Sequence, residues 1–239
     1  MKTQMTSKER ILATLAHEPT DHIPLCFDGI CHGLVTFINR QYPDRYKKCE
    51  YYLELGADTA MGVTPPLVSE AGFRTKEWKE TGVPGEAYPI LHKEYITPAG
   101  TICQRVRKTD DYPDHIRLIS DHNVPASRSI RYLVETEEDL EKLEYIMRPP
   151  AGKELDGFYA EAKKAREFCD RHQILMSGYL SGVGDPLMWF SGVERTLIAA
   201  LQEPEFLKQY VEIIARWDLH RMALMIDAGV DLIIRRGWY

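Results

Sequence analysis

Apolar residues recur at intervals of three and four along much of this chain, which is the spacing of amphipathic helices. Near the start, Thr6 and Glu9 have the spacing of a capping box, and an apolar stripe of Ile11, Leu12 and Leu15 follows it. The same periodicity predicts further helices at 46–56, 136–148, 156–168, 191–201 and 204–228.

Two of these helices carry additional signals. Ser191 and Glu194 repeat the capping-box spacing, which predicts that a helix opens at Ser191. The longest helix begins at Pro204, a residue favoured at the first helical position. We place its buried stripe at Leu207, Tyr210, Val211, Ile214, Trp217, Met222 and Ile226.

Short apolar runs separate the helices and predict strands. Four of them are expected in the core of the fold, at 22–27, 58–63, 174–179 and 230–234. Strands that alternate with helices imply right-handed crossovers and a parallel sheet. Residues 67–135 differ, because 90–96 and 101–108 alternate polar and apolar residues around a turn at 97–100. We interpret 67–135 as an antiparallel excursion within a single domain, 1–239.

Composition narrows the class of protein. The chain has 239 residues, of which 44% are hydrophobic and 28% charged, as in ordinary globular proteins. Its net charge of −6 gives no general attraction to nucleic acid or to an anionic membrane. No signal peptide or membrane-spanning run is present, and five cysteines favour reduced thiols. We therefore expect a cytoplasmic protein that acts on a small molecule, with neither nucleic acid nor membrane as a partner.

Familiar short catalytic signatures do not occur in the chain, but longer stretches resemble a known family. The run from Thr6 to Ala13 and the run from His17 to Pro24 resemble the opening of the uroporphyrinogen decarboxylase-like superfamily. Residues 174–179, Gly192, 203–205 and 228–231 follow in the order of that family. The resemblance implies a TIM-type (β/α)8 barrel with an N-terminal helix. Only about the first four barrel strands would be present, so the chain resembles a C-terminally truncated barrel.

The resemblance favours the methyltransferase branch of the superfamily. Where the decarboxylase has an arginine-bearing segment and a strand-end aspartate, this chain has Phe27–Gly33 and Thr59–Val63, and Trp189 stands near a tyrosine position. The implied reaction moves a methyl group between a small methylated substrate or carrier and a corrinoid protein. Zinc would act as a Lewis acid, with ligands expected in the C-terminal half that is absent here. Uroporphyrinogen decarboxylation and an inactive fragment or binding remnant are the alternatives, and a homodimer is left open.

Barrels of this kind bind substrates at the carboxyl ends of their strands, which selects candidate residues. No catalytic residue and no metal ligand can be assigned from the chain. One of the two arginines after the last strand is expected to face the site, because side chains alternate along a strand. The candidate substrate-binding residues are Asp28, His32, Tyr179, Asp185, Trp189, Arg235, Arg236 and Trp238.

Overall fold

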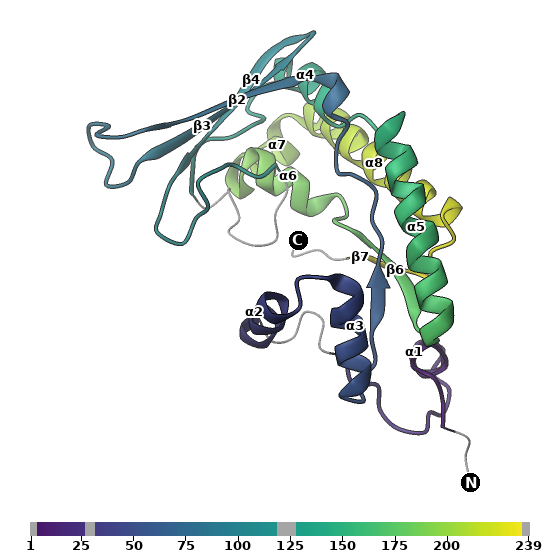
Figure 1. Ribbon diagram of the computed structural model, residues 1–239. Helices are drawn as coiled ribbons and strands as arrows, with labels where there is room; N and C mark the ends of the chain where they lie inside the picture. The colour runs from purple at the N-terminus through teal and green to yellow at the C-terminus, as the bar shows by residue number, and fades with distance from the viewer. Residues whose placement is uncertain (1–3, 27–31, 119–127, 236–239) are drawn as a thin grey trace. The chain divides into compact units, whose positions relative to one another are not determined.

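The computed structural model describes residues 4–26, 32–118 and 128–235, which divide into two compact units (Figure 1). The first unit combines residues up to 64 with 156–179 and 224–234. The second combines 65–155 with 180–223 and the chain from 235. Segments far apart in sequence therefore share one unit, while α8 contributes residues to both.

The first unit contains a small parallel sheet and several helices. Helix α3 contacts β1, and the two lie side by side in Figure 1. The helices of this unit are α1 (Ser7–Leu15), α2 (His32–Gln41), α3 (Arg45–Glu54) and most of α5 (Lys153–His172), and its strands are β1 (Ala60–Gly62), β6 (Leu175–Leu180) and β7 (Leu232–Arg235).

The N-terminal helix is fixed by local hydrogen bonds and by an ion-pair network. The capping box predicted at its start is confirmed, since Thr6 Oγ1 accepts from the Glu9 N–H at 3.2 Å and Glu9 Oε2 accepts from the Thr6 N–H at 2.8 Å. The Arg10 guanidinium donates to Asp21 at 2.7 Å and to Asp58 at 2.5 Å. This network holds the first helix against the start of β1.

The prediction of a barrel is wrong. The parallel sheet has three strands in the order β1-β6-β7, with β1 and β6 in parallel register. The strand expected at 22–27 contributes only one parallel bridge, Cys26 to Asp58, within the described residues. A barrel requires every strand to pair on both sides. The described ranges instead form an open sheet, because β6 lies between β1 and β7 and those two strands do not pair with each other.

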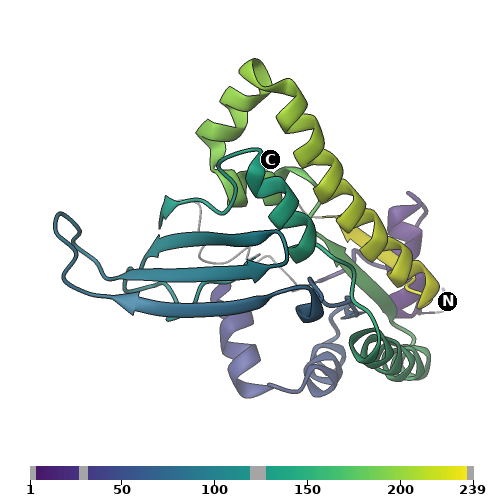
Figure 2. The ribbon, with the colours of Figure 1, turned by 90° about the horizontal axis from the view of Figure 1, so that it is seen from above.

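The second unit is built on that four-stranded antiparallel sheet, in the order β2-β3-β4-β5. Figure 2 shows β2, β3 and β4 as neighbouring arrows, with β2 at the outer edge. The hairpin predicted around 97–100 is confirmed, since Thr97 pairs with Gly100. The strands are β2 (Arg74–Glu80), β3 (Ile90–Thr97), β4 (Gly100–Arg107) and β5 (Ser129–Arg131), and the helices are a 3-10 turn η1 (Glu70–Gly72), α4 (Glu138–Ile146), α6 (Gly184–Ser191), α7 (Val193–Gln202) and the greater part of α8 (Pro204–Asp227).

A hydrophobic core joins one face of this sheet to the helices. Tyr95 and Ile102 from the hairpin share the core with Leu143 of α4, Phe190 of α6 and Ile214 of α8. The second predicted capping box is wrong, because Ser191, which was expected to cap the next helix, is the last residue of α6. Its hydroxyl lies 3.2 Å from the Tyr210 hydroxyl, and Gly192 occupies the N-cap position of α7.

The predicted stripe of α8 is confirmed at Tyr210 and Trp217, which are buried, but it is wrong in the last two turns of the helix. Ile226 is 61% exposed, whereas Arg221 and Met225 are buried. The buried face thus takes in a charged residue that an apolar pattern excludes. None of the helices in the described ranges combines the length and apolar character needed to cross a lipid bilayer.

Candidate functional site

Half of the predicted substrate-binding residues fall where the structure gives no side chain. Asp28, Arg236 and Trp238 lie outside the described residues. His32 is the first residue of α2, but its side chain is also outside the description. Their roles stay predictions.

Two predicted residues lie in or beside helix α6. Trp189 is 2% exposed and belongs to the hydrophobic core of the second unit. Asp185 is in the first turn of α6 and is also buried. The structure gives both side chains places in the protein interior, and a contact with substrate stays a prediction for each.

A small cavity in the first unit lies between α3 and β1. It encloses about 230 Å³ and is lined by Gly62, the predicted Tyr179, Thr59 and Cys49, among others. The Tyr179 ring is close to Gly62, because a Cβ added to that glycine would meet the ring at 3.1 Å. Any larger residue at Gly62 would therefore displace Tyr179.

Arg45 closes one side of this cavity through contacts with strand β1 and helix α5. Its guanidinium donates to the Gly62 carbonyl at 2.8 Å and forms an ion pair with Glu161 of α5. The Tyr46 hydroxyl donates to the same carboxylate at 2.7 Å, and this hydrogen bond lowers the pKa of Glu161. Because these polar groups satisfy one another, Arg45 and Glu161 are best explained as supports of the cavity wall.

A charged cluster in the second unit differs from this cavity, because some of its buried polar atoms are not hydrogen-bonded within the described residues. Asp218 and Arg221 lie one turn apart on α8 and are 6% and 2% exposed. Arg221 Nε and Nη1 and Asp218 Oδ1 have no hydrogen-bond partner in the part of the chain that the structure describes. Buried polar groups are nearly always hydrogen-bonded in native proteins. The cluster therefore has donors and an acceptor available to a ligand or to water.

Charge and aromatic contacts define the surroundings of this cluster. The guanidinium of Arg221 lies 4.7 Å from the centre of the Trp217 ring. Burial lowers the pKa of Arg221 to about 10, and attraction to Asp218 opposes the change. Burial raises the pKa of Asp218, and the positive charges of Arg221 and Arg235 oppose that rise. The predicted residue Arg235 thus acts electrostatically on a carboxyl group that sequence reasoning did not select.

Gly182 leaves room for Arg235 in this region. The glycine has a φ of +70°, and a Cβ added there would lie 2.9 Å from Arg235 Nε. Helix α8 supplies one guanidinium and one carboxyl group to this region, and the end of β7 supplies a second guanidinium, which lies against the loop before α6. Arginine suits planar anions because its N–H groups can donate to two oxygens at once. The arrangement is chemically suited to a carboxylate or phosphate.

Sequence reasoning missed Asp218 and Arg221 because it searched only the ends of strands. A signal was present in the chain. Ile214, Asp218, Arg221 and Met225 follow one another at intervals of four, three and four, so two charged residues occupy the buried face of α8. Charged residues at such positions are rare unless they are paired or functional.

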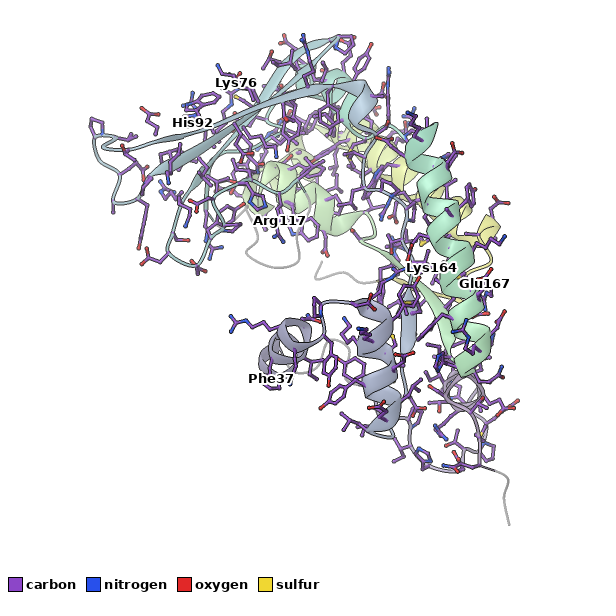
Figure 3. The ribbon with its side chains drawn as sticks, in the orientation of Figure 1. Phe37, Lys76, His92, Arg117, Lys164 and Glu167 are labelled. Atoms are coloured by element: carbon purple, nitrogen blue, oxygen red, sulfur yellow. The ribbon has the colours of Figure 1, made fainter. Side chains whose placement is uncertain are left out.

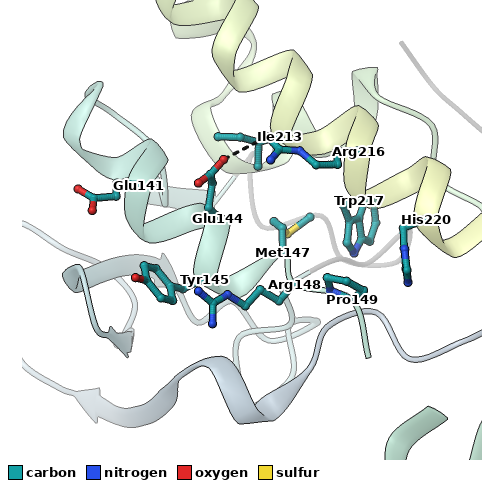
Figure 4. A pocket seen from close by; sticks show the side chains of 10 residues that line it. All are labelled: Glu141, Glu144, Tyr145, Met147, Arg148, Pro149, Ile213, Arg216, Trp217 and His220. Carbon is teal, nitrogen blue, oxygen red and sulfur yellow. Dashed lines mark hydrogen bonds and ion pairs between the residues drawn. The ribbon is translucent and has the colours of Figure 1, made fainter. Parts of the chain in front are cut away.

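A third feature is a cleft of about 420 Å³ between α4 and α8 (Figure 4). Glu144 and Arg216 face each other across it at 3.1 Å, and the Arg148 guanidinium stacks 4.1 Å from the Tyr145 ring. The indole N–H of Trp217 donates to the Leu67 carbonyl at 2.6 Å. These charged and polar groups already have partners, so the cleft is a weaker candidate than the cluster around Arg221.

The described residues contain no group of three or more histidine, cysteine, aspartate or glutamate side chains that could hold a metal ion. The zinc that the resemblance implies therefore finds no ligand set among them.

Comparison with known proteins gives one remote structural likeness. No family model and no curated protein sequence matches the chain. A solved structure, a methyltransferase from Methanosarcina mazei, is similar with a TM-score of 0.47 and 16% sequence identity. The match covers 98% of this chain and 59% of that protein, so the chain spans less than two thirds of its length. At these values the likeness establishes neither a family nor an activity for this chain.

Proposed function

We propose that this chain takes part in methyl transfer from a small methylated substrate that carries an anionic group. The acceptor would be a corrinoid held by a partner protein, as in the superfamily that the sequence resembles. The observation that carries the proposal is the buried Arg221, whose Nε and Nη1 have no partner among the described residues and which lies beside Asp218, a carboxyl group that Arg235 also influences. The resemblance supports the reaction class, and the cluster supports the substrate class.

The residues of the cluster would bind and orient the substrate. A carboxylate accepting from Arg221 would satisfy donors that have no partner in the described ranges, and Trp217 would hold the guanidinium in place. Zinc would polarise the atom that bears the methyl group. Since the described residues do not form a zinc site, that part of the chemistry is not assigned to them.

Matched methyl donors with and without a carboxylate test this proposal. The chain is incubated with free cob(I)alamin and either 4-methoxybenzoate or anisole, and methylcobalamin formation is followed by absorbance. We expect the wild-type chain to prefer the carboxylate-bearing donor, and Arg221→Met to reduce that preference about tenfold or more, as loss of a charge-assisted hydrogen bond would.

Arg216→Met is the matched control, because it removes an arginine of the same helix that pairs with Glu144 on the surface. The ratio between donors does not depend on how much of each variant is folded. An unchanged ratio in Arg221→Met would contradict the assignment of the anion site. Absence of methyl transfer from every donor, with a folded chain, would contradict the reaction class.

The arginines also favour a second candidate function. A uroporphyrinogen decarboxylase needs arginine side chains that meet the carboxylates of its substrate, and Arg221 and Arg235 are of that type. Release of CO2 from uroporphyrinogen, without methylcobalamin formation, would establish this alternative in place of the first.

A further inference from the structure

Strand β2 is an exposed edge of the antiparallel sheet. All seven of its residues, Arg74–Glu80, are exposed to solvent, and it pairs only with β3 among the described strands. Its outer edge therefore presents backbone N–H and C=O groups that another strand could pair with. Exposed edges of this length are commonly protected by charged residues, and β2 carries both signs of charge.

The order of these charges is self-complementary in one antiparallel register. When two copies of β2 are paired about a twofold axis at Trp78, Lys76 of one copy lies opposite Glu80 of the other. In the same register Glu77 lies opposite Lys79, and the two Trp78 residues face each other. Moving the axis to Glu77 would oppose two carboxylates, and moving it to Lys79 would oppose two ammonium groups. Two paired strands are stabilised when side chains opposite each other carry opposite charges or are both aromatic, and they are destabilised when those side chains carry like charges.

The side chain at the centre of this register is already held in place. The Trp78 ring stacks on His92 of β3, with centroids 4.7 Å apart and planes at 9°, yet Trp78 remains 38% exposed. The ammonium group of Lys76 lies 4.9 Å from the same ring. Lys76 and His92 are marked on this sheet in Figure 3. An ordered aromatic side chain costs little further conformational entropy when a partner covers it.

We propose that β2 pairs with β2 of a second copy of this chain, antiparallel and centred on Trp78, to give a continuous eight-stranded sheet across a homodimer. Such an interface is isologous, because both copies contribute the same residues. Main-chain hydrogen bonds would supply affinity, and the Lys76–Glu80 pairs, formed twice by symmetry, would select the register. This inference does not depend on the proposed enzymatic function.

Charge exchange tests both the partner and the register. Sedimentation velocity of the full chain over a concentration series should show a monomer–dimer equilibrium. Lys76→Glu alone and Glu80→Lys alone should each weaken the dimer about tenfold or more, since each variant creates two like-charge contacts. An equimolar mixture of the two variants should restore dimers, because every Lys76–Glu80 contact then joins opposite charges again. The double variant K76E/E80K should also dimerise.

Lys208→Glu is the control, since it makes the same charge change on an exposed position of α8 and should leave the dimer intact. A wild-type chain that stays monomeric up to its solubility limit would overturn the proposal and leave the edge to a different partner. Dimers that persist in both single variants would place the interface elsewhere. Single variants that weaken association, but whose mixture does not restore it, would exclude this register.

Discussion

Two buried arginines, one in each unit of the molecule, have opposite hydrogen-bonding environments. Arg10 in the first unit is 5% exposed and Arg221 in the second is 2% exposed. Arg10 donates to Asp21, to Asp58 and, at 2.6 Å, to the Met5 carbonyl. Arg221 leaves Nε and Nη1 without partners in the described chain and instead stacks near Trp217.

The comparison shows that burial alone does not reveal what a charged residue does. A buried guanidinium whose nitrogens all have hydrogen-bond partners stabilises the fold, because removing it leaves its carboxylates buried without a counter-charge. A buried guanidinium with unused donors carries a desolvation cost that a bound anion could offset. The hydrogen bonds, more than the exposure, separate a structural arginine from a ligand-binding one.

The largest expected effect concerns the partnered arginine. Arg10→Met should lower the free energy of unfolding by about 3 kcal/mol or more, because Asp58 is left buried without its partner. Urea denaturation followed by circular dichroism measures this change. Lys8→Met is the control: its ion pair with Asp231 is partly exposed, so the loss should stay below about 1 kcal/mol. Equal losses in the two variants would contradict the role of Arg10.

A smaller change in the free energy of unfolding is expected when Arg221 is replaced together with Asp218. The double variant D218N/R221M should unfold within about 1 kcal/mol of the wild type or be more stable, because replacing buried charges by neutral groups is often neutral or favourable. The same denaturation experiment applies. A loss as large as that of Arg10→Met would show that Asp218 and Arg221 are a structural ion pair, and the comparison between the two arginines would fail.

Local features of this fold could be predicted from the sequence. The capping box at Thr6 depends on residues three apart, and the hairpin at 97–100 depends on adjacent strands, so short-range patterns suffice for both. The barrel could not be predicted in the same way. Periodicity identifies strands but does not show whether they close, and the core that unites Tyr95 with Ile214 depends on contacts between residues more than a hundred positions apart.

The candidate site was predictable only in part. Arg235 was found because it follows a strand, but Asp218 and Arg221 were missed because the stripe of α8 was placed on Met222 and Ile226. An apolar pattern assigns the buried face by hydrophobicity, so it passes over a buried charge even where the spacing is correct. Whether such a charge has partners is decided by tertiary contacts, which the sequence of one helix does not contain.

The smallest expected effect is on the pH dependence of folding stability, to which Asp218 and Asp21 should contribute with opposite signs. Burial raises the pKa of Asp218, so the folded chain binds its proton more tightly than the unfolded chain, and this group lowers stability as pH rises above about 3.9. The hydrogen bond from Arg10 holds the pKa of Asp21 far below its usual range, so Asp21 contributes stability that is lost as pH falls below about 3.9.

Unfolding measured from acid to neutral pH separates the two aspartates. Relative to the wild type, Asp218→Asn should gain stability as pH rises, while Asp21→Asn should lose it over the acid range. The slopes with pH are compared, because each substitution also shifts stability by a pH-independent amount through its lost contacts. Slopes of the same sign would mean that Asp218 is ionised more readily in the folded chain than in the unfolded chain. Arg221 would then already be neutralised by a charged partner, and the buried cluster would have no need of an anionic ligand.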